Sequence, residues 1–176
     1  MVDVSGTVFR PKPSYGWAWL VALLLLVVVP MAPLLQPGAV TDEDVAGLWI
    51  AVAVTVPLVL FFLVALASLP AMRYELADDA LVVSCGPLLR YRIPYTEITD
   101  VRRTDLTPSL WSSMRLPGLA LWGVRYADVG NVHMCATRMA KGVLLISAGK
   151  RRYGITPADE VHFTGALSTR LRSASR

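Results

Sequence analysis

The sequence has few residues of the kinds that most often carry chemistry. Its 176 residues include only two cysteines and two histidines. Two cysteines cannot build a disulfide framework, and they offer too few ligands for a structural zinc site. Motifs typical of phosphate loops, dinucleotide binding, zinc proteases and redox CxxC sites are missing as well. We therefore predict no catalytic residue, no metal site and no cofactor, with an enzyme as a remote alternative.

Charged residues are also scarce. They make up 17% of the chain, whereas hydrophobic residues make up 55% and the mean hydropathy is +0.52. Soluble domains carry about 25% charged residues. A disordered chain needs the opposite balance, with low hydrophobicity and high net charge. The composition therefore indicates a membrane protein and argues against an ordinary soluble enzyme.

Two long apolar runs account for much of this excess. Residues 17–35 and residues 45–69 carry no charge over 19 and 25 positions. A helix needs about 20 residues to cross a hydrocarbon core of about 30 Å, so we predict two transmembrane helices with these bounds. A cleaved signal peptide is the alternative for the first run, because Arg10 and Lys12 precede it. The run is long for a signal peptide, however, and no small-residue cleavage site follows it.

The placement of charge predicts the orientation of the two helices. The segment 36–44 between them holds three acidic residues and no base, whereas 15 of the 17 basic residues follow the second helix. Segments rich in Lys and Arg stay in the cytoplasm. We expect residues 1–16 to be a cytoplasmic tail, 36–44 an external loop and 71–176 a cytoplasmic domain. The protein would then cross the inner (plasma) membrane twice, with both termini inside.

The net charge of +4 divides into +1 on the tail, −3 on the loop and +6 on the domain. A basic surface that faces an anionic inner leaflet explains this excess, so we expect the lipid bilayer as a partner and no nucleic acid. In the reducing cytoplasm, Cys85 and Cys135 should remain free thiols.

From residue 71 onward the pattern is typical of short strands. Apolar or alternating stretches predict strands at 72–76, 80–85, 88–93, 98–105, 119–126, 131–137, 142–147 and 151–155. Strands at intervals of about 8–12 residues are typical of an antiparallel barrel or sandwich. A helix follows, with Thr156 as its expected cap and Pro157 at its first position. Its apolar face should cover the open end of the barrel and consists of Phe163, Ala166, Leu167 and Leu171.

The order of about seven strands and one C-terminal helix is that of a pleckstrin-homology (PH) fold. The run YELADDALVVSCGPLLRYRIPYTEITDVRR at 74–103 resembles the opening of bacterial PH domains, including an I-P-Y-x-x-I step. RLPGLALWGVRYADVGNVHMCATR resembles the middle of membrane-tethered members, and RRYGITPADEVHF resembles their last strand and helix start. The resemblance covers about residues 71–172 and carries no catalytic signature. It implies a membrane α-helical hairpin joined to a mainly β (α+β) PH-like barrel of about seven antiparallel strands and one C-terminal helix.

Two groups of residues are candidate contact sites. The stretch 106–122 is unusually apolar, and we predict that it packs on the membrane interface or on the cytoplasmic ends of the helices. Barrel core is the expected place for Leu119 and Leu121 within it. The candidate membrane or partner contacts are Leu110, Trp111, Met114 and Arg115.

The second group is basic. A basic residue close to an anionic leaflet contributes about 1 kcal/mol of binding, and a solvated turn is the alternative role for these positions. The loop that holds phosphates in many eukaryotic PH domains is acidic here, with Asp78 and Asp79, and two carboxylates repel a phosphate. The candidate contacts with anionic lipid are Arg102, Arg103, Lys150, Arg151 and Arg152.

These patterns predict a non-catalytic integral membrane protein that presents a PH-like domain as an interaction or scaffold module, such as an accessory subunit of a membrane complex. Small residues in the helices could pack against other membrane helices, so we expect other membrane proteins or a second copy of the chain as partners. Sensing of anionic lipid at the inner leaflet is the alternative function.

Overall fold

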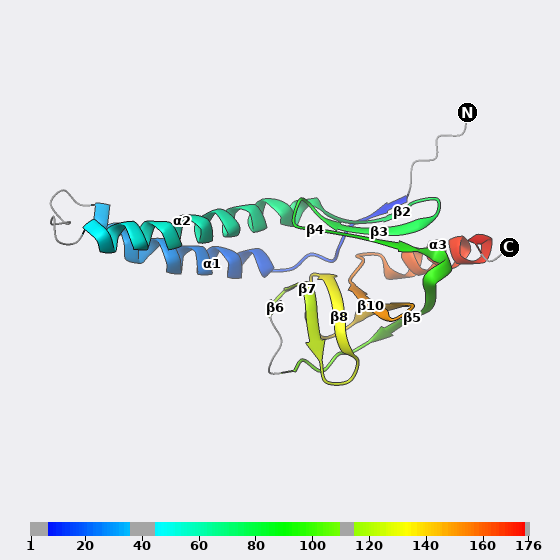
Figure 1. The fold of residues 1–176 in the computed structure, drawn as a ribbon. Coiled ribbons are helices and arrows are strands. Elements are labelled where there is room, and N and C mark those ends of the chain that lie inside the picture. The colour runs from blue at the N-terminus through cyan, green and yellow to red at the C-terminus, as the bar shows by residue number, and fades with distance from the viewer. Residues whose placement is uncertain (1–6, 36–44, 110–114, 175–176) are drawn as a thin grey trace, which may run out of the picture.

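Two long helices project from one end of a β-rich domain in the computed structural model, which describes residues 7–35, 45–109 and 115–174 (Figure 1). They are α1 (Gly16–Val28), which continues as the 3-10 helix η1 (Val29–Leu35), and α2 (Val45–Ser68), which ends in the 3-10 helix η3 (Leu69–Ala71). Both are long and apolar enough to cross a membrane. The α-helical geometry of α1 ends just before Pro30 because proline lacks the N–H that the ladder needs.

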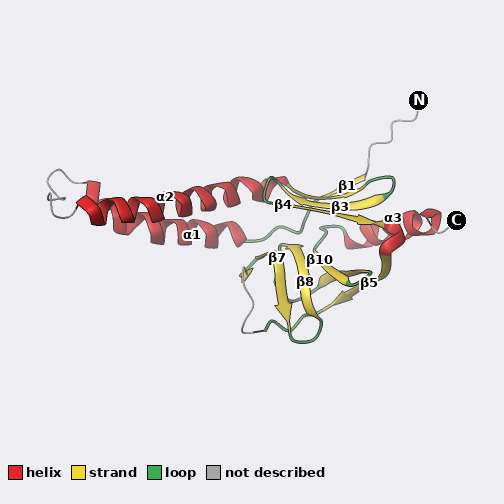
Figure 2. Ribbon diagram, viewed as in Figure 1, coloured by secondary structure: helices red, strands yellow, loops and turns green. Residues whose placement is uncertain are grey.

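The β-rich domain consists of two sheets and one helix (Figure 2). The first sheet has the order β1-β2-β3-β4, with β1 (Thr7–Phe9), β2 (Met72–Leu76), β3 (Ala80–Cys85) and β4 (Leu89–Pro94). A 3-10 helix, η4 (Tyr95–Glu97), leads to the second sheet, whose order is β5-β9-β10-β8-β7-β6. Its strands are β5 (Ile98–Thr104), β6 (Arg115–Leu116), β7 (Leu119–Tyr126), β8 (Gly130–Ala136), β9 (Val143–Ala148) and β10 (Arg151–Ile155), and α3 (Glu160–Ala174) follows.

The predicted order of two apolar helices, a strand-rich domain and a C-terminal helix is confirmed, but the strands do not close into a barrel. The strands form two separate sheets, and β10 runs parallel to β8 while it pairs antiparallel with β9. The hairpin β9–β10 folds back so that β10 inserts between β8 and β9. Alternation of apolar and polar residues reports which face of a strand is buried, but it does not report which strand lies beside it.

The main apolar core lies between the two sheets and includes both sheets, α3 and the two long helices. Phe163 and Leu167 of α3 are fully buried in it, and Ala166 and Leu171 pack at its margin, which confirms the predicted apolar face. A second cluster on the other side of the second sheet includes Val124, Tyr126, Val132, Met134 and Leu145.

Helix α3 begins later than the sequence predicts. The Asp159 carboxylate accepts a hydrogen bond from the backbone N–H of His162 at 3.0 Å, so Asp159 rather than Thr156 caps the helix. The Thr156 hydroxyl is buried and instead accepts a hydrogen bond from the backbone N–H of Thr137 at 2.9 Å. Pro157 belongs to an extended bridge with Pro11 and not to the helix.

The segment before α1 is part of the β-rich domain, although the sequence predicts only a tail at 1–16. Strand β1 pairs antiparallel with β2, and the Phe9 ring packs against the Phe163 ring at 5.1 Å. Beyond β1, the Lys12 N–H donates to the Thr156 carbonyl and the Ala158 N–H donates to the Arg10 carbonyl, both at 2.9 Å. Residues 7–12 and residues 72–174 therefore build one domain, and the helical hairpin is inserted between them.

A buried tyrosine in β2 connects the first sheet to β8 of the second sheet and to the chain that follows β10. The Tyr74 hydroxyl donates to the Cys135 carbonyl at 2.8 Å and accepts from the Thr156 N–H at 3.3 Å. Tyr74→Phe leaves both backbone groups unpaired in the core, so we expect a loss of about 1–3 kcal/mol in the free energy of unfolding. Denaturant unfolding of the detergent-solubilised protein measures it.

Tyr91→Phe is the matched control, since the Tyr91 hydroxyl makes no hydrogen bond to another residue that the structure describes. It should leave the stability near that of the wild type. Equal losses in the two variants would contradict the role assigned to the Tyr74 hydroxyl.

Candidate functional site

The helical hairpin meets the domain in a close backbone contact. Gly16, the first residue of α1, lies against Gly118 in the turn between β6 and β7, and a Cβ atom at Gly16 would be 2.5 Å from the Gly118 oxygen. The Ser14 hydroxyl donates to that same oxygen at 2.6 Å. Gly118 has a φ of +83°, which other residues adopt at a cost. We call this region, with the adjacent ends of α1 and α2, the junction.

A strained tryptophan lies beside the junction. Trp122 of β7 has a φ of 62°, and it is the one non-glycine residue with positive φ among the described segments. Such a conformation costs about 1–3 kcal/mol and persists only when the surrounding contacts enforce it. The Trp122 ring stacks on Phe61 of α2, with ring centroids 6.3 Å apart. The strain is therefore stored where the domain contacts the hairpin.

Two cavities open at the junction. The first, which we call the basic groove, has a volume of about 600 Å³ and lies between the chain entering α1 and the end of α2. The second, the apolar cleft, has a volume of about 360 Å³ and lies between the two helices and β6–β7. The described residues that line the cleft are all apolar, namely Leu20, Leu23, Leu58, Phe61, Phe62, Ala65, Leu116, Leu119, Leu121 and Trp122.

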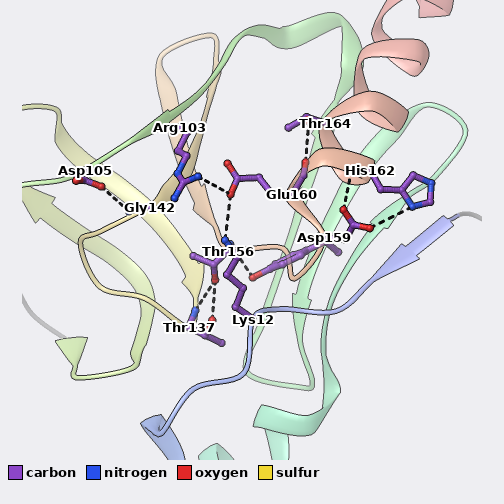
Figure 3. A network of polar contacts seen from close by, with 11 residues as sticks. Lys12, Arg103, Asp105, Thr137, Gly142, Thr156, Asp159, Glu160, His162 and Thr164 are labelled. Atoms are coloured by element: carbon purple, nitrogen blue, oxygen red, sulfur yellow. Dashed lines mark hydrogen bonds and ion pairs between the residues drawn. The ribbon is translucent and has the colours of Figure 1, made fainter.

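The basic groove borders a network of polar contacts (Figure 3). Glu160 at the start of α3 accepts a hydrogen bond from the Lys12 ammonium at 3.2 Å and lies 3.8 Å from the Arg103 guanidinium. Lys12 and Glu160 are each 19% exposed, so their ion pair is partly shielded from water. One carboxylate thus faces two cations in this network.

Most of the predicted membrane or partner contacts belong to the segment before β6. Leu110, Trp111 and Met114 lie outside the described residues, and Arg115 begins β6. The residues that follow do contact the helix ends: Leu116 and Trp122 line the apolar cleft, while Leu119 and Leu121 are buried in the core as expected. Contact through residues 110–115 themselves stays a prediction.

The five basic candidates do not form one surface. Arg102 pairs with Asp100 at 3.6 Å on one face of β5, whereas Arg103 on the other face approaches Glu160. Lys150 lies in the turn before β10, and Arg151 and Arg152 begin that strand, with the Arg152 guanidinium bonded to the Val129 carbonyl. Figure 1 shows β5 and β10 farther from the helices than β7. Lipid contact through these five side chains stays a prediction.

An aromatic cluster bridges the two sheets. The rings of His133 in β8, Tyr91 in β4 and Tyr153 in β10 form a triangle, with centroids 5.4–5.5 Å apart. Burial, and then the positive charge of Arg151, lower the pKa of His133. The imidazole is thus held neutral among rings.

The thiols are also in environments that suppress reactivity. Cys85 and Cys135 are free and buried. Burial raises the pKa of Cys85 to about 11 and raises the pKa of Cys135 as well, which keeps both protonated at neutral pH. Among the described residues, no group of three or more His, Cys, Asp or Glu side chains could hold a metal ion.

The β-rich domain has two sheets around a shared core and a C-terminal helix packed into that core. This arrangement defines the class of the protein as a PH-like domain joined to two apolar helices. The family model of the bacterial PH domain matches residues 72–171, and the chain belongs to this family, which is generally non-catalytic. Searches of curated proteins and of solved structures found no match to the chain. The match confirms the family resemblance of the sequence, while strand β1 lies outside the matched residues.

The close contact at Gly16 predicts a sensitivity to side-chain size. Gly16→Ala places a methyl group against the Gly118 backbone, so one element must shift, and we expect a loss of about 1–3 kcal/mol in stability. Gly47→Ala in α2 is the control, because a Cβ there meets nothing within 4 Å. Thermal unfolding in detergent, with limited proteolysis of the junction, measures both. Equal behaviour of the two variants would contradict the tight docking.

The lowered pKa of His133 predicts a pH dependence of stability. In the unfolded chain the His133 imidazole takes up a proton at a higher pH than it does in the folded chain. The free energy of unfolding should therefore fall as the pH drops through about 6.5. His133→Gln should lack this part of the loss, whereas His162→Gln, at an exposed position on α3, should keep it. Free energies of unfolding at about pH 7.5 and about pH 5 give the comparison. A wild-type pH dependence in His133→Gln would contradict this assignment.

Proposed function

We propose that the protein is a non-catalytic integral membrane protein that crosses the membrane twice and presents its PH-like domain in the cytoplasm as an interaction module. The pairing of β1 with β2 is the observation that carries the proposal. These neighbouring strands lie on either side of the hairpin in the sequence, so both ends of the hairpin must lie on the same side of a membrane. The basic charge of the domain and the acidic segment between the helices favour the cytoplasm for that side.

The attachment also fixes the orientation of the domain. A domain that follows a membrane helix through a single linker can rotate, whereas this domain is bound at both ends of the hairpin and again at the junction. A fixed orientation lowers the entropic cost of binding a partner that is confined to the same membrane. This argument supports a scaffold or accessory role toward another membrane protein.

Exposed apolar side chains mark where a partner could bind. The helices expose large hydrophobic residues along their length, as membrane helices do, including Leu26, Trp49, Ile50 and Val54. On the domain, Val161 of α3 is 84% exposed and Val8 of the edge strand β1 is 54% exposed. Edge strands are templates for pairing with another chain, so this side of the domain is the expected contact region.

The topology is tested by labelling with a membrane-impermeant maleimide. In intact cells with a permeable outer envelope, Ala39→Cys in the segment between the helices should react. Ser5→Cys and Ser173→Cys should react only after lysis, since both termini are placed inside. The native cysteines are buried and should react slowly in the folded protein. Labelling of Ser5→Cys from outside would contradict the hairpin topology.

The interaction role is tested by photo-crosslinking in native membranes. A photoreactive amino acid at Val161 or at Val8 should give an adduct with another membrane protein, or a dimer of the chain. The same group at Lys141, an exposed position in the turn before β9, is the control and should give none. Absence of adducts at Val161 and Val8 alike would contradict the interaction role of this side of the domain.

A further inference from the structure

The basic groove lies where lipid headgroups would be if α1 and α2 cross a membrane. Trp17 in the first turn of α1 forms one wall, and Leu66 and Leu69 at the end of α2 form another. Tryptophan is enriched at this depth of a membrane because its ring is apolar and its N–H is polar. The inference below rests on the proposed function for this placement.

The charge of the groove is of one sign. Among the described residues, Arg10 and Lys12 line it and no carboxylate does. Lys12 already pairs with Glu160, which Arg103 also approaches. The Arg10 side chain is exposed and has no ion pair within the described segments, although the Arg10 carbonyl is bonded to the Ala158 N–H. An exposed guanidinium that makes no ion pair within the described segments is suited to bind a phosphate through two parallel hydrogen bonds.

The remainder of the groove is suited to the part of a lipid that joins headgroup and chains. Trp17, Leu66, Leu69 and Met72 supply apolar surface next to the two cations. The volume of about 600 Å³ lies within the range of small-molecule sites, which is about 300–1,000 Å³. A soluble anion would use the cations alone, whereas a phospholipid uses the cations and the apolar wall together.

The turn between β2 and β3, at residues 77–79, is acidic and does not offer this chemistry. Asp79 accepts hydrogen bonds from Arg92 at 2.6 and 2.9 Å, and Asp78 lies 3.4 Å from Arg170. The hydrogen bond from Arg92 lowers the pKa of Asp79, so this carboxylate stays ionised at neutral pH. Arg92 and Arg170 are already paired with the carboxylates of the turn, so a phosphate group would have to displace a carboxylate to bind there.

We propose that the basic groove binds an anionic phospholipid of the inner leaflet, with the Arg10 guanidinium on the phosphate, Lys12 beside it and the Trp17 side of the groove against the glycerol and upper chains. The lipid would bridge the end of α2 and the segment that leads from β1 into α1. Bound lipid would therefore hold the domain against the membrane at the point where the hairpin begins and ends.

The test uses the full-length protein in mild detergent micelles with added phosphatidylglycerol or phosphatidylcholine. Native mass spectrometry and thermal unfolding report binding, because a ligand that binds the folded state raises the unfolding temperature. We expect phosphatidylglycerol to bind and stabilise the wild type, and phosphatidylcholine to do neither. Arg10→Gln should weaken binding of phosphatidylglycerol about tenfold or more, as expected for the loss of one charge-assisted contact.

Arg125→Gln is the matched control, because it removes the same charge from an exposed position on β7. It should bind phosphatidylglycerol like the wild type, and Arg10→Lys should retain part of the binding. Equal loss in Arg10→Gln and Arg125→Gln would overturn the proposal in favour of diffuse charge. Equal stabilisation by glycerol phosphate would overturn the lipid as ligand in favour of a soluble phosphate.

The outcome separates this inference from the proposed function. Binding in micelles does not depend on which side of a membrane the domain occupies. Labelling of Ser5→Cys from outside would therefore defeat the proposed topology and the inner leaflet as the source of lipid, while loss of selective binding through Arg10 would defeat the groove alone.

Discussion

The structure depends on the backbone pairing between a strand that precedes the helical hairpin and a strand that follows it. Strand β1 alone is three residues long and could not persist in isolation. It is held because Phe9 enters the core against Phe163, and because the chain after it exchanges hydrogen bonds with residues 156–158. The entry to α1 and the exit from α2 are thereby fixed relative to one fold.

This constraint explains features that would otherwise be unrelated. Once the ends of the hairpin are fixed, α1 must begin beside the β6–β7 turn, and only glycine at positions 16 and 118 leaves room for that contact. The side chain of Trp122 then lies against Phe61, at the cost of an unfavourable φ. The basic groove exists for the same reason, because it is the space between the incoming and outgoing chain.

Much of the fold could be predicted from local pattern. The apolar runs gave the two helices, and the bounds of β2, β3, β7 and β10 agree with the predicted ranges because each strand alternates or is β-branched and ends at a turn residue. Strand β1 was missed because three residues, Thr7 to Phe9, carry too little periodicity, although β-branched and aromatic residues favour a strand. The cap at Thr156 was misassigned because its hydroxyl is used by Thr137, which is distant in sequence.

At the candidate site, too, local pattern predicts some features, whereas contacts between distant residues decide the others. The sequence shows only that Arg10 and Lys12 lie shortly before an apolar run, so it predicts for them no role beyond that of basic residues flanking the first helix. That Lys12 pairs with Glu160, 148 residues away, follows only from the docking of α3 beside the entry to α1. By itself the sequence determined the two apolar helices, the strands and the PH family, because these follow from composition and from periods of a few residues. Only the tertiary structure decided the two-sheet arrangement, the inclusion of the N-terminal segment and the groove, because each depends on contacts between residues far apart along the chain.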